Sequence, residues 1–160
     1  MQLILLSRIL LFKIIMTQKS FYLDSCIWLN LFKEEGDSNK GVPYWKIAKE
    51  FIEKIILSKD KEIVFSGFIL KELKHKLDDS TFEEKLLFLK NEEKFRFIKA
   101  TEGDYTLGRK LESESKFDIS FFDCIHVAIC KRVNSTLVTR DLKLIGFAKD
   151  YVEVIKPEEI

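Results

Sequence analysis

Short apolar runs alternate along the chain with longer segments in which apolar residues recur every three or four positions. The short runs predict five β-strands, at 20–24, 62–66, 95–99, 136–139 and 152–155. The helical spacing predicts helices at 26–34, 42–58, 67–78, 81–91, 101 to about 116, 120 to about 133, and a short one after Asp141. Because short strands alternate with helices, the pattern indicates βαβ units and an α/β fold with a mostly parallel sheet.

The size and composition of the chain favour one compact domain. Its 160 residues are 46% hydrophobic and include 14 Phe, with only 2 Pro and 6 Gly. Such a chain can bury a substantial core and has few long irregular loops. We therefore expect a single domain at 16–160.

The first residues form a separate apolar segment. Twelve of the sixteen residues from Met1 to Met16 are apolar, with Arg8 and Lys13 interrupting them. The segment is too short to span a bilayer and is followed by no small-residue cleavage site. We interpret residues 1–15 as an extension that precedes a natural start at Met16, with a membrane-surface anchor as the alternative.

Charge and cysteine content exclude several classes of protein. A formal net charge of +1 gives no large field that would attract a polyanion. The three cysteines, Cys26, Cys124 and Cys130, form no Cys-x-x-Cys pair, which argues against a disulfide framework or a zinc ribbon. We expect a reducing, cytoplasmic location and no membrane span. His75 and His126 lack metal-site companions at the usual spacing.

Four carboxylates stand where an apolar run ends or a helix begins: Asp24, Glu72, Asp123 and Asp141. Open α/β sheets gather ligand groups at the carboxyl ends of their strands. Like charges a few ångströms apart repel by roughly 4 kcal/mol at an effective dielectric of ~20, so a cluster requires shared protons or a bound metal. The metal is the favoured interpretation.

Each carboxylate also has a structural explanation. Asp24 and Asp141 both precede helical patterns, where an aspartate commonly serves as an N-cap. Glu72 has lysine neighbours typical of a solvated helix face. Asp123 completes Ser120-x-x-Asp123, which resembles a capping box. It also lies inside an otherwise apolar run, where a buried charge requires a partner.

Three polar neighbours leave similar alternatives open. Ser25 and Thr139 flank the candidate acids, and their hydroxyls either orient a carboxylate or serve a cap or turn. His126 lies three residues after Asp123 on the same side of the predicted helix. It either pairs with that acid or is a hydrogen-bonded core residue, and the core role is the more frequent case.

Four segments, taken together, resemble the PIN-domain nucleases in their order and spacing, from about Ser20 to Ile160. They are Tyr22-Leu23-Asp24-Ser25-Cys26-Ile27-Trp28-Leu29, Phe65-Ser66-x-x-Ile69-Leu70-x-Glu72-Leu73, Asp123-x-x-His126-Val127-Ala128 and Leu137-Val138-Thr139-x-Asp141. The helices at 40–60 and 81–116 depart from the family pattern.

The resemblance implies a three-layer α/β/α sandwich with an acidic pocket for Mg²⁺ or Mn²⁺. The family's four acids correspond to Asp24, Glu72, Asp123 and Asp141, and its hydroxyl positions to Ser25 and Thr139. It implies that Asp24 and Asp123 are metal ligands, that Asp141 is a ligand or lies just outside the ligands, and that Glu72 is a ligand or a base that orients water.

The implied activity is a metal-dependent endoribonuclease that hydrolyses phosphodiester bonds of single-stranded RNA, because a flexible strand enters a cleft that excludes a duplex. Small members of the family resemble toxins paired with an antitoxin, others act in RNA maturation, and family members often form homodimers. The competing interpretations are a non-catalytic binding module and a nucleotide-binding or phosphotransfer protein. The second lacks its glycine-rich signatures here.

Overall fold

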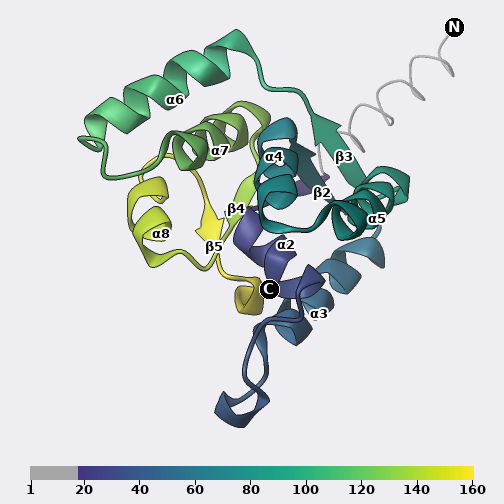
Figure 1. Cartoon of the computed structure of the whole chain (residues 1–160). Coiled ribbons are helices and arrows are strands. Elements are labelled where there is room, and N and C mark those ends of the chain that lie inside the picture. The colour runs from purple at the N-terminus through teal and green to yellow at the C-terminus, as the bar shows by residue number, and fades with distance from the viewer. Residues whose placement is uncertain (1–17) are drawn as a thin grey trace, which may run out of the picture.

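One five-stranded sheet organises the protein, whose computed structural model describes residues 18–160. The strand order is β3-β2-β1-β4-β5, and every neighbouring pair is parallel (Figure 1). The strands are β1 (Lys19–Leu23), β2 (Lys61–Ser66), β3 (Phe95–Ile98), β4 (Thr136–Val138) and β5 (Val154–Ile155). The predicted parallel sheet is confirmed. The interpretation of residues 1–15 lies outside the described residues.

The helices follow the predicted alternation with the strands. They are α2 (Ser25–Phe32), α3 (Tyr44–Ile56), α4 (Gly67–Lys76), α5 (Asp79–Asn91), α6 (Glu102–Glu114), α7 (Phe121–Val133) and α8 (Leu142–Ala148), with 3₁₀ turns η1 (Ser38–Lys40) and η2 (Pro157–Glu159). Within residues 18–160, none of these helices is long and apolar enough to cross a membrane.

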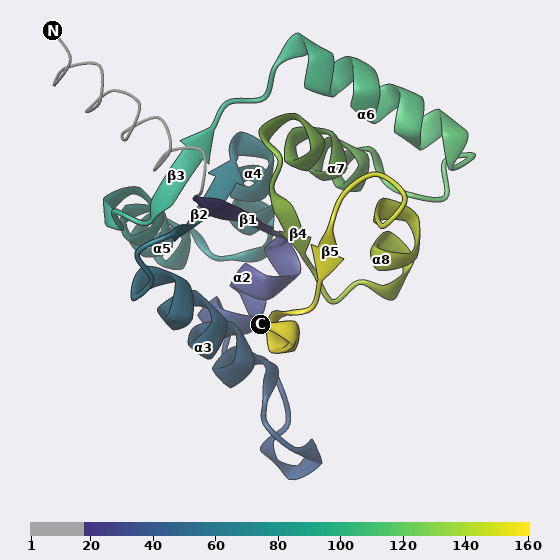
Figure 2. The ribbon, with the colours of Figure 1, turned by 180° about the vertical axis from the view of Figure 1, so that it is seen from behind.

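The sheet lies between two layers of helices, as the resemblance implies. Helices α3 and α5 cover one face, α7 and α8 cover the other, and α6 packs outside α7 (Figures 1 and 2). Successive side chains of β1 point to opposite faces of the sheet and so contact both helical layers. The ring centroid of Phe21 lies 5.6 Å from that of Phe51 in α3, and the ring centroid of Tyr22 lies 5.3 Å from that of His126 in α7.

The core is dense and rich in aromatic side chains, as the composition predicts. Trp28 is fully buried and packs edge-on against Phe95. Helix α7 is buried at every position from Cys124 to Cys130. Burying one large apolar side chain contributes about 1.5–3 kcal/mol, so this central helix is held firmly in place. The described cysteines form no disulfide.

The strand order reverses between β1 and β4, where open α/β sheets form a crevice outside the carboxyl ends of their strands. The chain leaves β1 toward β2 on one side, and it leaves β4 toward β5 on the other, so their carboxyl ends flank a point where the topology reverses. Such points are the usual ligand sites of open α/β sheets. The backbone N–H of Asp24 donates to the carbonyl of Val138 at 3.0 Å, which fixes the two strand ends side by side.

Candidate active site

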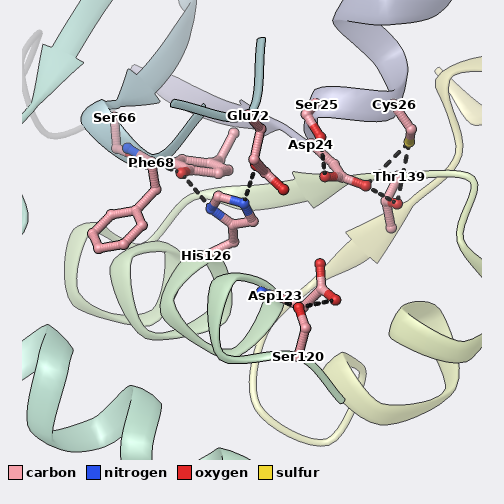
Figure 3. A network of polar contacts seen from close by, with 11 residues as sticks. Asp24, Ser25, Cys26, Ser66, Phe68, Glu72, Ser120, Asp123, His126 and Thr139 are labelled. Atoms are coloured by element: carbon pink, nitrogen blue, oxygen red, sulfur yellow. Dashed lines mark hydrogen bonds and ion pairs between the residues drawn. The ribbon is translucent and has the colours of Figure 1, made fainter. Parts of the chain in front are cut away.

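Asp24 follows β1 directly and takes the N-cap position of α2 without capping that helix. Its carboxylate accepts no hydrogen bond from a backbone N–H group of α2. Instead Oδ2 accepts a hydrogen bond from the Thr139 hydroxyl at 2.7 Å and one from the Cys26 thiol at 3.1 Å. The residue is only 5% exposed. The capping interpretation is therefore wrong for Asp24, and its buried carboxylate faces the crevice (Figure 3).

Thr139 lies fully buried beyond the end of β4 and joins both sides of the crevice. Its Oγ1 donates to Asp24 and accepts the backbone N–H of Asp141 at 3.1 Å. The hydroxyl thus orients the carboxylate and also serves the turn. Ser25 Oγ lies 3.5 Å from Asp24 Oδ1, which is long for a hydrogen bond.

Glu72 projects from α4 toward the same space, and His126 of α7 meets it there (Figure 3). His126 Nε2 lies 2.8 Å from Glu72 Oε2. The glutamate side chain is 23% exposed, and the histidine is fully buried. Burial lowers the pKa of His126, but the hydrogen bond to Glu72 and the surrounding carboxylates outweigh it and hold that pKa above its ordinary value.

Asp123 lies in the first turn of α7 and points into the space below Asp24 (Figure 3). Its Oδ2 accepts the Ser120 hydroxyl at 2.6 Å. Burial raises the pKa of Asp123, and the negative charges of Asp24 and Glu72 raise it further, against the Ser120 hydrogen bond and His126. The expected capping box is half formed, because Ser120 caps the helix but the Asp123 carboxylate does not bond the Ser120 backbone.

Asp141 caps α8, which confirms the interpretation of this residue as an N-cap. Its Oδ1 accepts the backbone N–H groups of Lys143 and Leu144 at 2.9 and 3.0 Å. The residue is exposed and lies outside the group of close ligand atoms described below. Its assignment as a metal ligand stays a prediction.

The donor set fits a divalent cation. Asp24, Glu72 and His126 each offer a ligand atom, and these atoms lie within 4.8 Å of one another, with the Asp123 carboxylate directed at them. Among residues 18–160, no Lys or Arg forms an ion pair with the three acids. The N-termini of α2 and α7 add partial positive charge. Carboxylate oxygens are the ligands that Mg²⁺ and Mn²⁺ prefer.

A pocket of about 430 Å³ lies beside Glu72. Its lining combines cations with one aromatic ring: Ser25, Lys71, Glu72, His75, Lys76 and Phe122. Another pocket, of about 460 Å³, lies among Lys19, Ser135 and Thr136 at the amino ends of β1 and β4. The described potential metal ligands gather only beside the first pocket. The chemistry therefore belongs to the carboxyl end of the sheet.

His126 is a site residue that the sequence interpretation did not include among the candidate ligands. The interpretation as a hydrogen-bonded core residue is confirmed, since His126 is fully buried and bonded to Tyr22 and Glu72. The expectation that it has no metal-site companions is wrong, because ligand atoms of Asp24 and Glu72 lie within 4.8 Å of its ring nitrogen. Asp123-x-x-His126 does place both residues on one side of α7. Glu72, however, precedes His126 by 54 positions, and only the packing of α4 against the sheet brings the two together.

Comparison with known proteins agrees with this architecture. A protein-family model for the PIN domain matches residues 21–150. FitAcB from Neisseria gonorrhoeae is 18% identical at a TM-score of 0.61, over 88% of this chain and 99% of that chain. VapBC2 from Rickettsia felis, solved bound to a DNA fragment from their promoter, is 19% identical at a TM-score of 0.63, over 86% and 98%.

A third similar structure is VapC20 from Mycobacterium tuberculosis, described as a sarcin-ricin loop cleaving toxin. It is 19% identical at a TM-score of 0.58, over 84% of this chain and 98% of that chain. At such identities these structures demonstrate the shared fold. A search of curated proteins finds no match. Because the family model covers most of the sequence, the chain belongs to the PIN domain family of nucleases.

Proposed function

We propose that the protein is a Mg²⁺- or Mn²⁺-dependent endoribonuclease that hydrolyses phosphodiester bonds of single-stranded RNA. One observation carries this proposal: Asp24 occupies an N-cap position yet caps no backbone N–H of the helix, and its carboxylate faces Glu72 and Asp123. A binding module that used its acids only as helix caps would not place them in this way. The non-catalytic alternative is therefore disfavoured.

In this mechanism Asp24 and Asp123 would hold the metal, and Glu72 would bind it or orient the attacking water. When bound, a divalent ion polarises the phosphodiester and makes an attacking water more acidic. Thr139 fixes the Asp24 carboxylate through its 2.7 Å hydrogen bond, and so keeps it preorganised. Asp141 acts from outside the ligands, because its backbone N–H bonds Thr139 and its carboxylate holds the start of α8.

The pocket beside Glu72 suits a single strand. Neither Lys71 nor Lys76 forms an ion pair with a residue in the described part of the chain, so both are free to contact phosphates. Phe122 presents a ring at the pocket wall, where an unpaired base can stack. A duplex keeps its bases inside the helix and cannot use such a ring.

A cleavage assay tests the proposal. Labelled single-stranded RNA is incubated with the wild type in Mn²⁺, Mg²⁺ or EDTA, alongside Asp24→Asn and the matched control Asp60→Asn, an exposed aspartate that precedes β2. We expect metal-dependent cutting by the wild type and the control, and none by Asp24→Asn. Cutting in EDTA, or by Asp24→Asn, would contradict the mechanism.

We also propose that the protein is the toxin of a toxin–antitoxin pair. The similar structures include one described as a toxin–antitoxin complex from Klebsiella pneumoniae, of which 98% is covered. An antitoxin that covers the site, and a homodimer, are the proposed partners. Expression of the wild type is then expected to arrest growth, whereas Asp24→Asn is harmless. Normal growth with an active enzyme would favour RNA maturation instead.

A further inference from the structure

A chain of buried hydrogen bonds runs from β2 through His126 to Glu72. Ser66 Oγ lies 2.6 Å from the Tyr22 hydroxyl, and that hydroxyl lies 2.7 Å from His126 Nδ1. His126 Nε2 completes the chain at 2.8 Å from Glu72 Oε2 (Figure 3). Ser66, Tyr22 and His126 are all fully buried, so water cannot replace a missing partner.

The direction of this chain follows from its last member. Glu72 Oε2 is a carboxylate oxygen and accepts, so the ring hydrogen of a neutral imidazole lies on Nε2, facing Glu72. His126 Nδ1 then accepts the Tyr22 hydroxyl. The Tyr22 oxygen can in turn accept the hydroxyl of Ser66, whose Oγ also accepts the backbone N–H of Phe68 as the cap of α4. This arrangement gives every buried donor in the chain an acceptor.

His126 Nε2 carries a hydrogen in the charged form as well. An imidazolium donates from both nitrogens, so it also directs Nε2–H at Glu72. Only a neutral ring with its hydrogen on Nδ1 would present a lone pair at Nε2, and that lone pair would face a carboxylate oxygen 2.8 Å away. Because such a contact is repulsive, Nε2 is a donor in both favourable states.

A hydrogen-bond donor cannot also be a metal ligand, since a metal binds the ring-nitrogen lone pair. We propose that His126 is a positioning residue, which holds the Glu72 carboxylate toward Asp24 and Asp123 and does not itself bind the metal. This inference rests on the proposed metal-dependent function. It assigns a role to Tyr22 too, whose hydroxyl fixes the ring for that contact.

Three variants separate positioning from ligation. His126→Gln keeps an N–H donor within reach of Glu72, and His126→Leu keeps the volume without the donor. Tyr22→Phe removes only the hydroxyl. Each variant is first checked for folding by circular dichroism and thermal unfolding, and Mn²⁺ affinity is then measured by calorimetry. Pulsed electron paramagnetic resonance of bound Mn²⁺ reports whether an imidazole nitrogen is coordinated.

We expect no directly coordinated ¹⁴N in the wild type. His126→Leu should weaken Mn²⁺ binding by about 10–100-fold, the usual cost of losing a residue that orients a metal ligand, and His126→Gln should restore near wild-type affinity. Tyr22→Phe should fall between them. If His126→Leu does not fold, the spectrum of the wild type and the Mn²⁺ affinities of the other two variants still distinguish positioning of Glu72 from metal ligation by His126.

Two results would overturn the inference alone, with the wild type binding Mn²⁺ and cutting RNA. One is a strong ¹⁴N coupling that disappears in His126→Gln, which would make His126 a ligand. The other is unchanged Mn²⁺ affinity in all folded variants, which would leave it a purely structural residue. A folded wild type that neither binds Mn²⁺ nor cuts RNA would overturn the proposed function and this inference together.

Discussion

Helices α6 and α7 begin with the same local motif, yet the aspartate in the first turn of α6 is paired with an arginine and the one in α7 is not. Thr101 and Ser120 are the caps, and Asp104 and Asp123 follow them at the third helical position. The Asp104 carboxylate accepts the Thr101 backbone N–H at 2.8 Å and three hydrogen bonds from Arg132. Asp123 receives no cation, and its carboxylate points at other acids.

The pKa values of the two carboxyls diverge accordingly. Burial by itself raises the pKa of Asp104, but Arg132 and the Thr101 backbone lower it below its ordinary value. Burial raises the pKa of Asp123, and its acidic neighbours add to the effect. Local sequence therefore determines the helix cap. Residues from distant segments determine whether the carboxylate in the first turn is neutralised and stabilises the fold, or remains available to bind a cation.

The largest expected effect is on catalysis. Asp123→Asn should reduce RNA cleavage by at least ~100-fold, since even the outer partners of metal ligands contribute about 10–100-fold. Asp104→Asn, which changes the same residue type at the same helical position, should retain the wild-type rate while folded. Initial rates in Mn²⁺ at a temperature where both variants are folded measure the difference. Equal losses in both variants would erase the distinction between the two helix starts.

The next effect is on stability. Arg132→Met leaves the charge of Asp104, which is 2% exposed, without its partner. We expect it to lower the free energy of unfolding by about 2 kcal/mol, toward the low end for a buried pair because Arg132 itself is partly exposed. Lys131→Met, at the exposed neighbouring position, is the control and should change it by less than about 0.5 kcal/mol. Urea unfolding in EDTA compares them, and a similar loss in both would count against the pair.

Acid should remove the contribution of Asp104. The pKa of Asp104 is lowered in the folded state. Just below an ordinary aspartate pKa of about 4, this carboxyl is therefore protonated in the unfolded chain but still ionised in the folded protein. The stability is fully present above that value and is lost as the pH falls through the folded pKa. Unfolding free energies of the wild type and Asp104→Asn should converge as the pH falls below about 4. A gap that stays constant over this range would show that the charge is irrelevant.

The smallest expected effect is on stability at Asp123, where the pKa shift and its contribution to stability have the opposite sign from those of Asp104. Because the pKa of Asp123 is raised in the folded protein, ionisation of this carboxyl lowers the stability of the fold. The loss is fully present above the pKa of the folded state and absent below the pKa of the unfolded chain. In EDTA at neutral pH, Asp123→Asn should therefore raise the midpoint of thermal unfolding by about 2–4 °C, or roughly 1 kcal/mol for a domain of this size. Scanning calorimetry measures it. A lowered midpoint would mean that the Asp123 carboxylate supports the fold.

Much of the fold could be predicted because its signals are local. The five strands are short apolar runs, and the caps at Thr101 and Ser120 depend on residues three positions apart. Asp24 and Asp141 were equivalent at that level, since both precede helices. The structure separates them through hydrogen bonds to Thr139 and to the start of α8.

The remaining site geometry depends on tertiary packing, which no local pattern contains. Glu72 has lysine neighbours typical of a solvated face, and only the arrangement of α4 beside α7 turns it toward His126. Tyr22 appears in the sequence as one apolar residue of a strand. Its hydroxyl reaches Ser66 and His126 because β1 lies next to β2 and beneath α7.

Titration of the metal-free protein with Mn²⁺ tests the central claim most directly, that uncompensated carboxylates form a metal site. At a Mn²⁺ concentration about 100 times the Kd, binding should add about 2.7 kcal/mol to the stability of the wild type and of Asp104→Asn. Asp24→Asn and Asp123→Asn should gain far less. A wild type that gains nothing, or an Asp24→Asn variant that gains as much as the wild type, would contradict the account.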